Sequence, residues 1–363
     1  METFDRLAQL GIEVDGYALE GLRADVSSGF ERVTTLVRLT GGGHDGVGED
    51  VVYDAVDHEA LQAAGPVHDL SGHWTLEDFC AHVESLDLFG VEPQRDVSRL
   101  YRLWAFHSAA LDLALRQAGL TLEQALARPA QPMRYVVSLR LGEPPSLEPI
   151  AKRLALDPTL RFKLDATSSW TPELFNALTA TGAVDSVDFK SFYRGTIVDQ
   201  AADPVLYRRV VEAFPDAWLE DADIVDEATA AVLASEHDRL TWDAPIHSIA
   251  DIEALAFPPK MVNIKPSRIG ALPRLCATYD YCAERGIGAY GGGQTELGPG
   301  RGQAQYLAAL FHPDTPNDLA PSGYNAVDPP AGLPASPLVP VALKPGFRWD
   351  ATGPARKGLT SIA

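Results

Sequence analysis

Between residues 161 and 268 the chain reads, in order, RFKLDAT (161–167), SVDFKSF (186–192), AWLEDAD (217–223), LTWDAPI (240–246) and MVNIKPSR (261–268). Each segment is a short apolar run, which is the pattern of a buried strand. Helical patterns separate the segments, such as PVLYRRVVEAF at 204–214. Strands that alternate with helices predict parallel strand pairing.

The alternation continues on both sides of this region. RYVVSLRLG (134–142) precedes it, GIGAYGGG (286–293) follows it, and NDLAPSGYN (317–325) is a weaker eighth strand. Eight strand–helix units in roughly 200 residues predict an α/β fold, a (β/α)8 TIM-type barrel. An open doubly wound sheet is the rival fold, but no G-x-G-x-x-G follows a strand near the start of the region.

The N-terminal third of the chain mixes strands and helices. FERVTTLVRLTGGG (30–43) and GVGEDVVYD (46–54) have strand composition. LEDFCAHVESL (76–86) and VSRLYRLWAFHSAALDLALRQAGL (97–120) have apolar residues at helical spacing, and the second is apolar enough on all sides to be a buried helix.

These patterns divide the chain into three parts. We expect an N-terminal α+β capping domain at 1–130 and the barrel domain at 131–325. The remaining residues, 326–363, are rich in proline and glycine. We expect them to form an irregular C-terminal tail that packs back on the cap.

Composition limits the partners. The 363 residues include 50 acidic and 30 basic ones, for a formal net charge of −20. A chain this acidic repels phosphate groups. We therefore expect neither a nucleic acid nor a membrane as a partner. Three cysteines without a C-x-x-C pair, no signal-peptide pattern and no run of 18 apolar residues predict a cytoplasmic protein. The oligomeric state, a homo-oligomer included, is left open.

Charged residues recur at one position of successive strands. They lie 22 to 32 residues apart, about one strand–helix unit, and therefore near the C-terminal ends of the strands, where barrels carry their active sites. In order they are Lys163, Asp188, Glu220, Asp243 and Lys265. Side chains two residues apart on a strand share a face, so Asp165 should lie with Lys163, and Lys190 with Asp188.

Three of these residues are candidate metal ligands. Asp188, Glu220 and Asp243 on adjacent strands would converge, and three carboxylates that close do not all stay ionised without a cation. Ligation by oxygen alone favours Mg²⁺. The alternative is that each acid caps a helix or forms a surface ion pair, but three acids in phase on consecutive strands favour the metal.

Two lysines flank the three acids. A lysine near a divalent cation and other lysines has a lowered pKa and can act as a base near neutral pH. We favour Lys265 as this base, whereas Lys163 is equally well explained as an electrostatic or structural group that neutralises the carboxylates.

The motifs together resemble the enolase superfamily, and its muconate-lactonizing branch most. GVGEDVVYD resembles the glycine–glutamate turn of that family's cap. AFHSAALDLALRQAGLTLEQAL (105–126) resembles the helix that ends the cap, with Asp112 at the recurring aspartate. In the barrel, FKLD resembles the Lys-x-Lys strand, VDFK the Asp-x-Asn strand, WLEDAD the Glu-x-Pro strand, TWDAP the Asp-Glu-Ser strand, NIKPSRIG the lysine-bearing sixth strand and GGGQTELGPG the end of strand 7.

This resemblance covers residues 1–325 and implies a reaction. Mg²⁺ holds the carboxylate of a small carboxylic acid, a base removes the proton alpha to it, and an enediolate forms. Racemisation, epimerisation, cycloisomerisation or elimination follows, so the resemblance implies a lyase or an isomerase. No histidine ends strand 7, so the His–Asp dyad of the mandelate-racemase branch is absent.

The sequence departs from the family pattern at three positions. Asp165 replaces the second lysine of Lys-x-Lys, Lys190 replaces the asparagine of Asp-x-Asn, and Ala244 replaces the glutamate of Asp-Glu-Ser. We therefore take Lys163, Asp165, Lys190 and Lys265 as the candidate catalytic set. If Asp165 keeps Lys163 charged, Lys265 is the one base, which predicts elimination or a syn isomerisation rather than racemisation.

Alternatives remain open for these substitutions. Lys190 could serve as the missing second lysine, or its ammonium could crowd or replace the metal. A barrel that has lost the reaction and acts as a ligand-binding protein is the second reading.

Four further residues are candidates for contact with the substrate. Ser28 and Phe30 lie in a cap loop, and mobile cap loops of this family cover the substrate. Glu296 ends strand 7, and Arg301 follows in a turn at an expected helix start, where an anionic group can bind.

Overall fold

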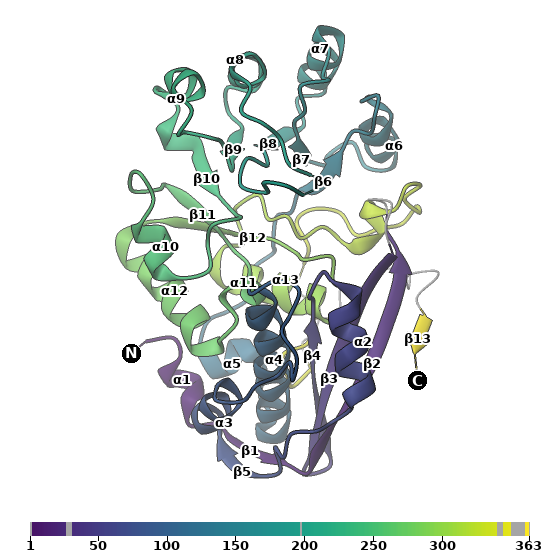
Figure 1. The fold of residues 1–363 in the computed structure, drawn as a ribbon, viewed down its shortest axis with the longest axis vertical. Helices are drawn as coiled ribbons and strands as arrows, with labels where there is room; N and C mark the ends of the chain where they lie inside the picture. Colours follow the sequence, from purple (N-terminus) through teal and green to yellow (C-terminus); the bar gives the residue numbers. More distant parts are fainter. Residues whose placement is uncertain (1, 27–30, 197, 340–343, 350–359, 363) are drawn as a thin grey trace.

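The barrel is built around one parallel sheet (Figure 1). The computed structural model describes residues 2–26, 31–196, 198–339, 344–349 and 360–362. Within these residues, seven strands pair in the order β6-β7-β8-β9-β10-β11-β12, each parallel to its neighbours. They are β6 (Val137–Arg140), β7 (Phe162–Asp165), β8 (Val184–Asp188), β9 (Trp218–Glu220), β10 (Leu240–Trp242), β11 (Met261–Ile264) and β12 (Gly288–Gly291).

Residues 317–318 fill the eighth position of the barrel. Asn317 forms a parallel bridge to Tyr135, just before β6, and Asp318 forms one to Gly292, just after β12. Within the described residues, the weak eighth strand expected at 317–325 is thus reduced to two bridges, and Pro321 could not extend the ladder, because proline has no N–H to donate. The expected (β/α)8 architecture with an N-terminal cap is confirmed.

Helices connect the strands. Several begin at a side chain that accepts backbone N–H bonds, such as Thr171 before α7, Asp203 before α8 and Ser248 before α10. Their bounds are α6 (Glu148–Leu156), α7 (Pro172–Thr181), α8 (Pro204–Ala213), α9 (Glu227–Leu233), α10 (Ile249–Glu253), α11 (Pro266–Ile269), α12 (Leu272–Arg285) and α13 (Gly300–Phe311), with short 3-10 turns at His237–Arg239 and Ser322–Asn325.

The cap packs an antiparallel sheet against one long helix. Residues 104–115 of α4 are all buried, as the sequence predicts. Gly48 on β4 permits the close approach, since a Cβ there would lie 1.9 Å from the carbonyl oxygen of Ala105. The cap elements are α1 (Asp5–Ala8), β1 (Gly11–Val14), β2 (Gly16–Asp25), β3 (Glu31–Gly41), β4 (His44–Asp50), α2 (Ala55–Ala64), β5 (Gly72–Thr75), α3 (Leu76–Glu84), α4 (Ser98–Ala118) and α5 (Leu122–Leu126).

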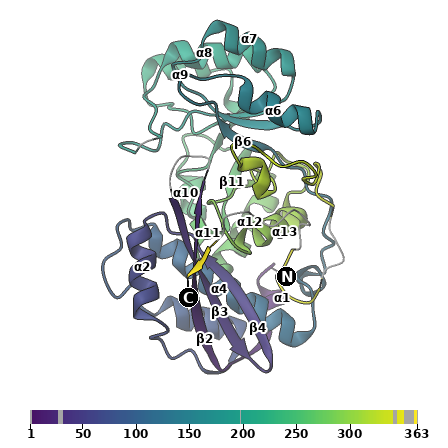
Figure 2. The same ribbon diagram turned by 90° about the vertical axis from the view of Figure 1, so that its right-hand side faces the viewer.

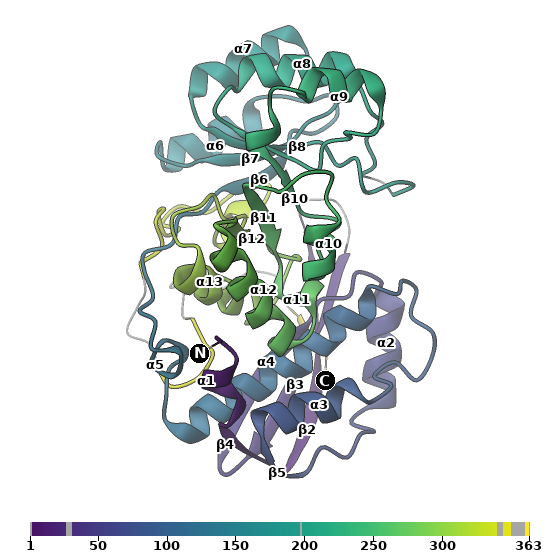
Figure 3. The ribbon, with the colours of Figure 1, turned by 90° about the vertical axis from the view of Figure 1, so that its left-hand side faces the viewer.

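The cap lies beside the second half of the barrel. Figure 3 shows α11 and α12 next to α4, with α6–α9 at the far end of the molecule. The amide of Leu272, at the start of α12, donates to Nδ1 of His107 on α4 at 3.1 Å. The cap is therefore joined to the barrel through its central helix.

Described parts of the tail return to the cap and the barrel. Leu338 pairs with Met133, and the amide of Phe347 donates to Asp112 on α4 at 2.8 Å. A last strand, β13 (Thr360–Ile362), pairs with β2 at the edge of the cap sheet (Figure 2). The division of the chain at residues 130 and 325 stays a prediction.

No helix in the described ranges combines the length and the apolar character that crossing a bilayer requires.

Candidate active site

Parallel pairing places the predicted site residues at the same end of the sheet. Asp165 on β7 lies in register with Asp188 on β8, and Asp188 with Glu220 on β9. These are the last residues of their strands, so their side chains gather at the C-terminal end of the barrel, which we call the mouth.

Three buried carboxyl groups form the centre of the mouth. One oxygen from each of Asp188, Glu220 and Asp221 lies within 4.8 Å of the others, and none of the three side chains is exposed. Burial raises the pKa of Glu220 well above its ordinary value. Burial, and then the charges of Asp188 and Asp243, raise the pKa of Asp221 to about 7.

Asp221 is a member of this group that sequence reasoning missed. Strand alternation would place it opposite Glu220, but its backbone has a positive φ of 51°, which turns the chain at the end of β9. Its carboxylate accepts the amides of Asp243 at 2.8 Å and Ala244 at 3.0 Å. It thereby joins the ends of β9 and β10. The signal in the sequence was the acidic pair directly after an apolar strand.

Lys163 is buried among the acids of the mouth. Its Nζ lies 3.2 Å from Asp188 Oδ2, contacts Glu220, and lies 3.5 Å from Asp318 Oδ2. Burial lowers the pKa of this lysine, but these carboxylates outweigh burial and hold it well above its usual value. Lys163 is therefore a charged group that balances the carboxylates.

Lys190 makes the ion pair that Lys163 was expected to make with Asp165. The Nζ of Lys190 lies 3.4 Å from Asp165 Oδ1 and also contacts Asp188. Lys190, two residues after the end of β8, has a φ of +56°, which is uncommon for a residue with a Cβ. The structure thus differs from the sequence-based expectation, because the long Lys190 side chain spans from β8 to the carboxylate on β7.

Lys265 and Asp243 form a second ion pair in the mouth. Lys265 Nζ donates to Asp243 Oδ2 at 2.7 Å, and Arg268 on α11 donates to Asp243 Oδ1 at 2.9 Å. Burial opposes ionisation of Asp243, but Arg268 and Lys265 outweigh it and lower its pKa well below the ordinary value. Tyr193 donates to the same carboxylate at 3.2 Å. Asp243 is thus held outside the compact group of three acids.

The remaining predicted residues divide into two cases. Glu296 and Arg301 are buried and pair with each other, with 3.2 Å between Glu296 Oε2 and Arg301 Nε. Ser28 and Phe30 lie outside the described residues.

The donor set fits a hard divalent cation. Three neighbouring buried carboxylates repel one another, and the positive charges that contact them in the described structure are the ammonium groups of Lys163 and Lys190. Carboxylate oxygens are the ligands that Mg²⁺ prefers. Asp188 and Glu220 lie next to each other, as the sequence predicts. The third ligand, predicted as Asp243, stays a prediction, since Asp221 lies closer to the pair.

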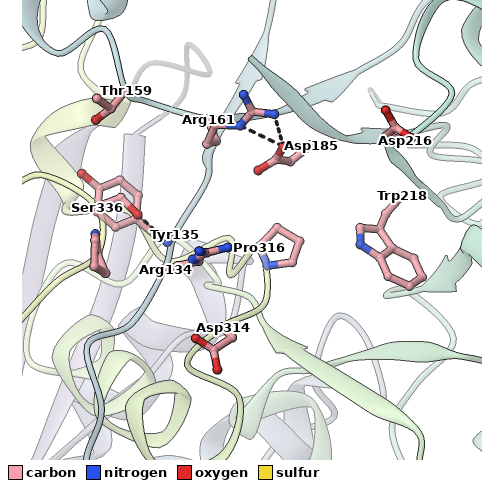
Figure 4. Close-up of a pocket in the computed structure, with 11 residues that line it drawn as sticks. Arg134, Tyr135, Thr159, Arg161, Asp185, Asp216, Trp218, Asp314, Pro316 and Ser336 are labelled. Atoms are coloured by element: carbon pink, nitrogen blue, oxygen red, sulfur yellow. Dashed lines mark hydrogen bonds and ion pairs between the residues drawn. The ribbon is translucent and has the colours of Figure 1, made fainter. Parts of the chain in front are cut away.

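A cavity of about 510 Å³ lies at the opposite end of the barrel and contains none of these residues. Figure 4 shows it between the starts of β6, β7 and β9, lined by Arg134, Arg161 and Trp218 among others. Arg161 there donates to Asp185 at 2.9 Å. In barrels this end contributes to stability rather than chemistry, so the mouth remains the candidate active site.

Solved structures with the same fold are members of the enolase superfamily. A superfamily member from Roseovarius nubinhibens ISM, complexed with magnesium, is 17% identical over 97% of this chain and 99% of that chain, with a TM-score of 0.66. A muconate cycloisomerase from Pseudomonas fluorescens is 18% identical over 94% and 97%, with a TM-score of 0.63. The resemblance to this superfamily is therefore confirmed in the fold.

Two o-succinylbenzoate synthases are similar to this chain in sequence. The o-succinylbenzoate synthase of Geobacillus stearothermophilus is 27% identical over 306 residues, 76% of this chain and 78% of that protein. That of Bacillus subtilis (strain 168) is 38% identical over 63 residues, only 17% of each chain. The chain belongs to the DUF8230 family, whose members are described as domains of unknown function: residues 5–125 match its N-terminal domain and residues 129–326 its C-terminal domain.

Proposed function

We propose that the protein is a Mg²⁺-dependent lyase or isomerase that removes the proton alpha to the carboxylate of a small acid. The observation that carries this proposal is the charge arrangement of the mouth. Buried Asp188 and Glu220 stand beside Lys163, and a separate Asp243–Lys265 pair faces the same end of the barrel. The names and folds of the relatives support the proposal.

Asp188, Glu220 and Asp243 are the proposed metal ligands. Mg²⁺ would supply positive charge that binds the substrate carboxylate and stabilises the enediolate. Asp221 secures the backbone of Asp243 and Ala244, so it positions the third ligand.

Lys265 is the proposed base. It is 6% exposed and approaches the mouth from β11, on the side opposite Lys163 and Lys190. Removal of the proton creates negative charge next to Lys163, whose ammonium is held in place by three carboxylates and can stabilise that charge.

One base favours particular outcomes. Lys163 contacts three carboxylates and Lys190 two, whereas Lys265 contacts one, so Lys265 is the lysine proposed to move the proton. A single base can return the proton to the same face or deliver it to a leaving group. Elimination or a syn isomerisation is therefore favoured over racemisation.

The test is proton exchange in D₂O with Mg²⁺, over a panel of acid sugars, dipeptides and N-acyl amino acids. The proposal expects deuterium at the alpha carbon of at least one acid, and none in the presence of EDTA. Deuterium in both epimers of a product would contradict the one-base mechanism. Absence of Mg²⁺ binding by the parent protein would contradict the proposal as a whole.

A specific observation supports a second candidate, a ligand-binding protein without the reaction. Lys190 places its ammonium on Asp188, where the family has an asparagine two residues after the metal ligand. If that ammonium takes the place of the cation, Lys190→Asn should create or strengthen Mg²⁺ binding.

A further inference from the structure

One buried amide inside the barrel has no partner. Asn263 on β11 is 1% exposed, and among the described residues neither its Oδ1 nor its Nδ2 has a hydrogen-bond partner. Gln294, by comparison, has one unpartnered atom, while its Oε1 accepts a bond from Tyr53 at 2.9 Å. Buried polar groups are almost always bonded, so an amide with two unmet atoms calls for an explanation.

Asn263 lies beside the proposed base. It precedes Lys265 by two residues, and the two side chains share a face of the strand. Both pack against Gly292: a Cβ built there would lie 2.3 Å from Lys265 Cε, 2.8 Å from Asn263 Nδ2 and 3.0 Å from Asn263 Oδ1. The amide and the lysine chain are therefore neighbours, and the absence of a side chain at position 292 makes room for both.

Two hydroxyl groups on the strands beside β11 donate to other acceptors. Tyr290, which lies in register with Asn263 on β12, donates to Glu220. The hydroxyl of Thr241 on β10 donates to the carbonyl of Met261 at 2.8 Å. Each of these hydroxyls donates its proton elsewhere, and neither forms a hydrogen bond with the amide of Asn263, which leaves both amide atoms available to a bound molecule.

The amide also limits the chemistry of that molecule. Nδ2 is a donor and Oδ1 is an acceptor. A carboxylate satisfies only the donor and an ammonium only the acceptor, whereas an amide satisfies both with two atoms and a hydroxyl satisfies both with one. We propose that Asn263 is a substrate-contacting residue that binds a hydroxyl of the substrate, next to the carbon from which Lys265 removes the proton.

This proposal rests on the proposed function and narrows its substrate class to hydroxy acids. Measurement can distinguish this proposal from a structural role, because replacing a structural amide removes hydrogen bonds that stabilise the fold. Asn317 supplies the matched control: it is equally buried, its Oδ1 accepts the amide of Gly291 at 2.7 Å, and its Nδ2 donates to the carbonyl of Arg134 at 3.0 Å.

The first measurement is thermal unfolding without ligand. Asn263→Leu, which has a similar size and no polar atom, should melt at the temperature of the parent or above it. Asn317→Leu should melt several degrees lower, because it leaves backbone groups unbonded. If Asn263→Leu melts as low as the control, Asn263 has a structural partner and the proposal is overturned.

The second measurement compares binding of malate and succinate in the presence of Mg²⁺, by calorimetry. These acids differ by one hydroxyl, and a site built for a hydroxyl rejects the analogue that lacks it. The parent should bind one enantiomer of malate about 10-fold or more tightly than succinate, and Asn263→Leu should abolish that preference while leaving succinate affinity unchanged. A parent without the preference, or a variant that keeps it, would overturn the proposal. A parent that fails to bind Mg²⁺ would instead refute the proposed function.

Discussion

Two regions of the molecule bury charge in different ways. One is the seam, where β3 and β4 of the cap contact residues 294–300 after β12, and the other is the mouth. At the seam, Glu49 of β4 accepts backbone amides of Leu297 at 2.6 Å, Gly298 at 2.9 Å and Gly300 at 2.9 Å. Arg32 of β3 likewise donates to backbone carbonyls, including that of Gln294 at 3.0 Å. The seam thus satisfies its buried charges with fixed backbone dipoles.

In the mouth, Asp221 also accepts backbone amides, but the lysines and the other acids pair with side chains. Lys163 is bound by Asp188 and Glu220, and Lys265 by Asp243. Such partners can be exchanged for a cation or a substrate, whereas backbone dipoles cannot leave. Burial alone therefore does not identify a functional charge, whereas the kind of partner helps to identify it.

The largest expected effect is the loss of alpha-proton exchange when the proposed base of the mouth is removed. Lys265→Ala should reduce alpha-proton exchange by about 10²- to 10⁴-fold, the usual contribution of a general base. Mg²⁺ affinity should change little, because a base is not a ligand. Exchange measured by NMR in D₂O, with exposed Lys152→Ala as the control, decides the point. Exchange near the parent rate would reduce Lys265 to an electrostatic neighbour.

The next largest effect should come from replacing a proposed metal ligand, which should lower Mg²⁺ affinity only when the acid lies in the mouth. Asp188→Asn should weaken Mg²⁺ binding by about 100-fold or more, since even residues that only support metal ligands contribute about 10- to 100-fold. Asp112→Asn in the cap is the matched control, because that buried carboxylate lies outside the mouth, where it accepts the amides of Val47 at 2.9 Å and Phe347 at 2.8 Å and pairs with Arg348 at 2.8 Å. Titration calorimetry should show unchanged Mg²⁺ affinity in the control. Equal losses in both variants would contradict the distinction.

The seam should respond in stability rather than in chemistry. Glu49→Ala leaves several buried amides without an acceptor and should lower the free energy of unfolding by about 1.5–3 kcal/mol, the range for hydrogen bonds to charged groups. Mg²⁺ affinity should stay within about 2-fold of the parent if the barrel keeps its shape. Urea unfolding and calorimetry on the same preparation test both parts. A large loss of Mg²⁺ affinity with little loss of stability would place Glu49 in the functional site.

The sequence predicted the mouth better than the seam for a physical reason. Parallel strands repeat one strand–helix unit, so the positions of Lys163, Asp188 and Glu220 follow from spacing alone. Glu49 and Leu297 are far apart in the chain, and no periodicity links a cap strand to a loop after β12. Contacts of that kind depend on the docking of two domains.

Within the mouth, the sequence could not assign partners. Asp165 is as close in sequence to Lys163 as the motif implies, but the ammonium of Lys190 reaches it from the next strand. Asp318 was overlooked because its segment reads as a weak strand, yet it lies 3.5 Å from Lys163. Long lysine side chains choose among neighbouring carboxylates, and that choice is made in three dimensions.

The smallest expected effect is a difference in pH dependence between the two regions. Burial, and then the nearby charge of Glu296, raise the pKa of Glu49 above its ordinary value, whereas bonds from the amides of Gly298 and Gly300 oppose the rise. In the mouth, burial also opposes ionisation of Asp188, but Lys190 and Lys163 outweigh it and lower that pKa.

An acid with a raised pKa in the folded state stabilises the fold most below its ordinary pKa of 4.5 and loses that contribution as pH rises. An acid with a lowered pKa stabilises the fold above 3.8 and loses its contribution as pH falls. Glu49→Gln, which keeps an acceptor but cannot ionise, should therefore flatten the decline in stability as pH rises above 4.5, by less than the loss expected for Glu49→Ala. Urea unfolding without Mg²⁺ at several pH values tests this, and a variant whose stability declines as steeply as that of the parent would show that the seam carboxylate does not titrate in this range.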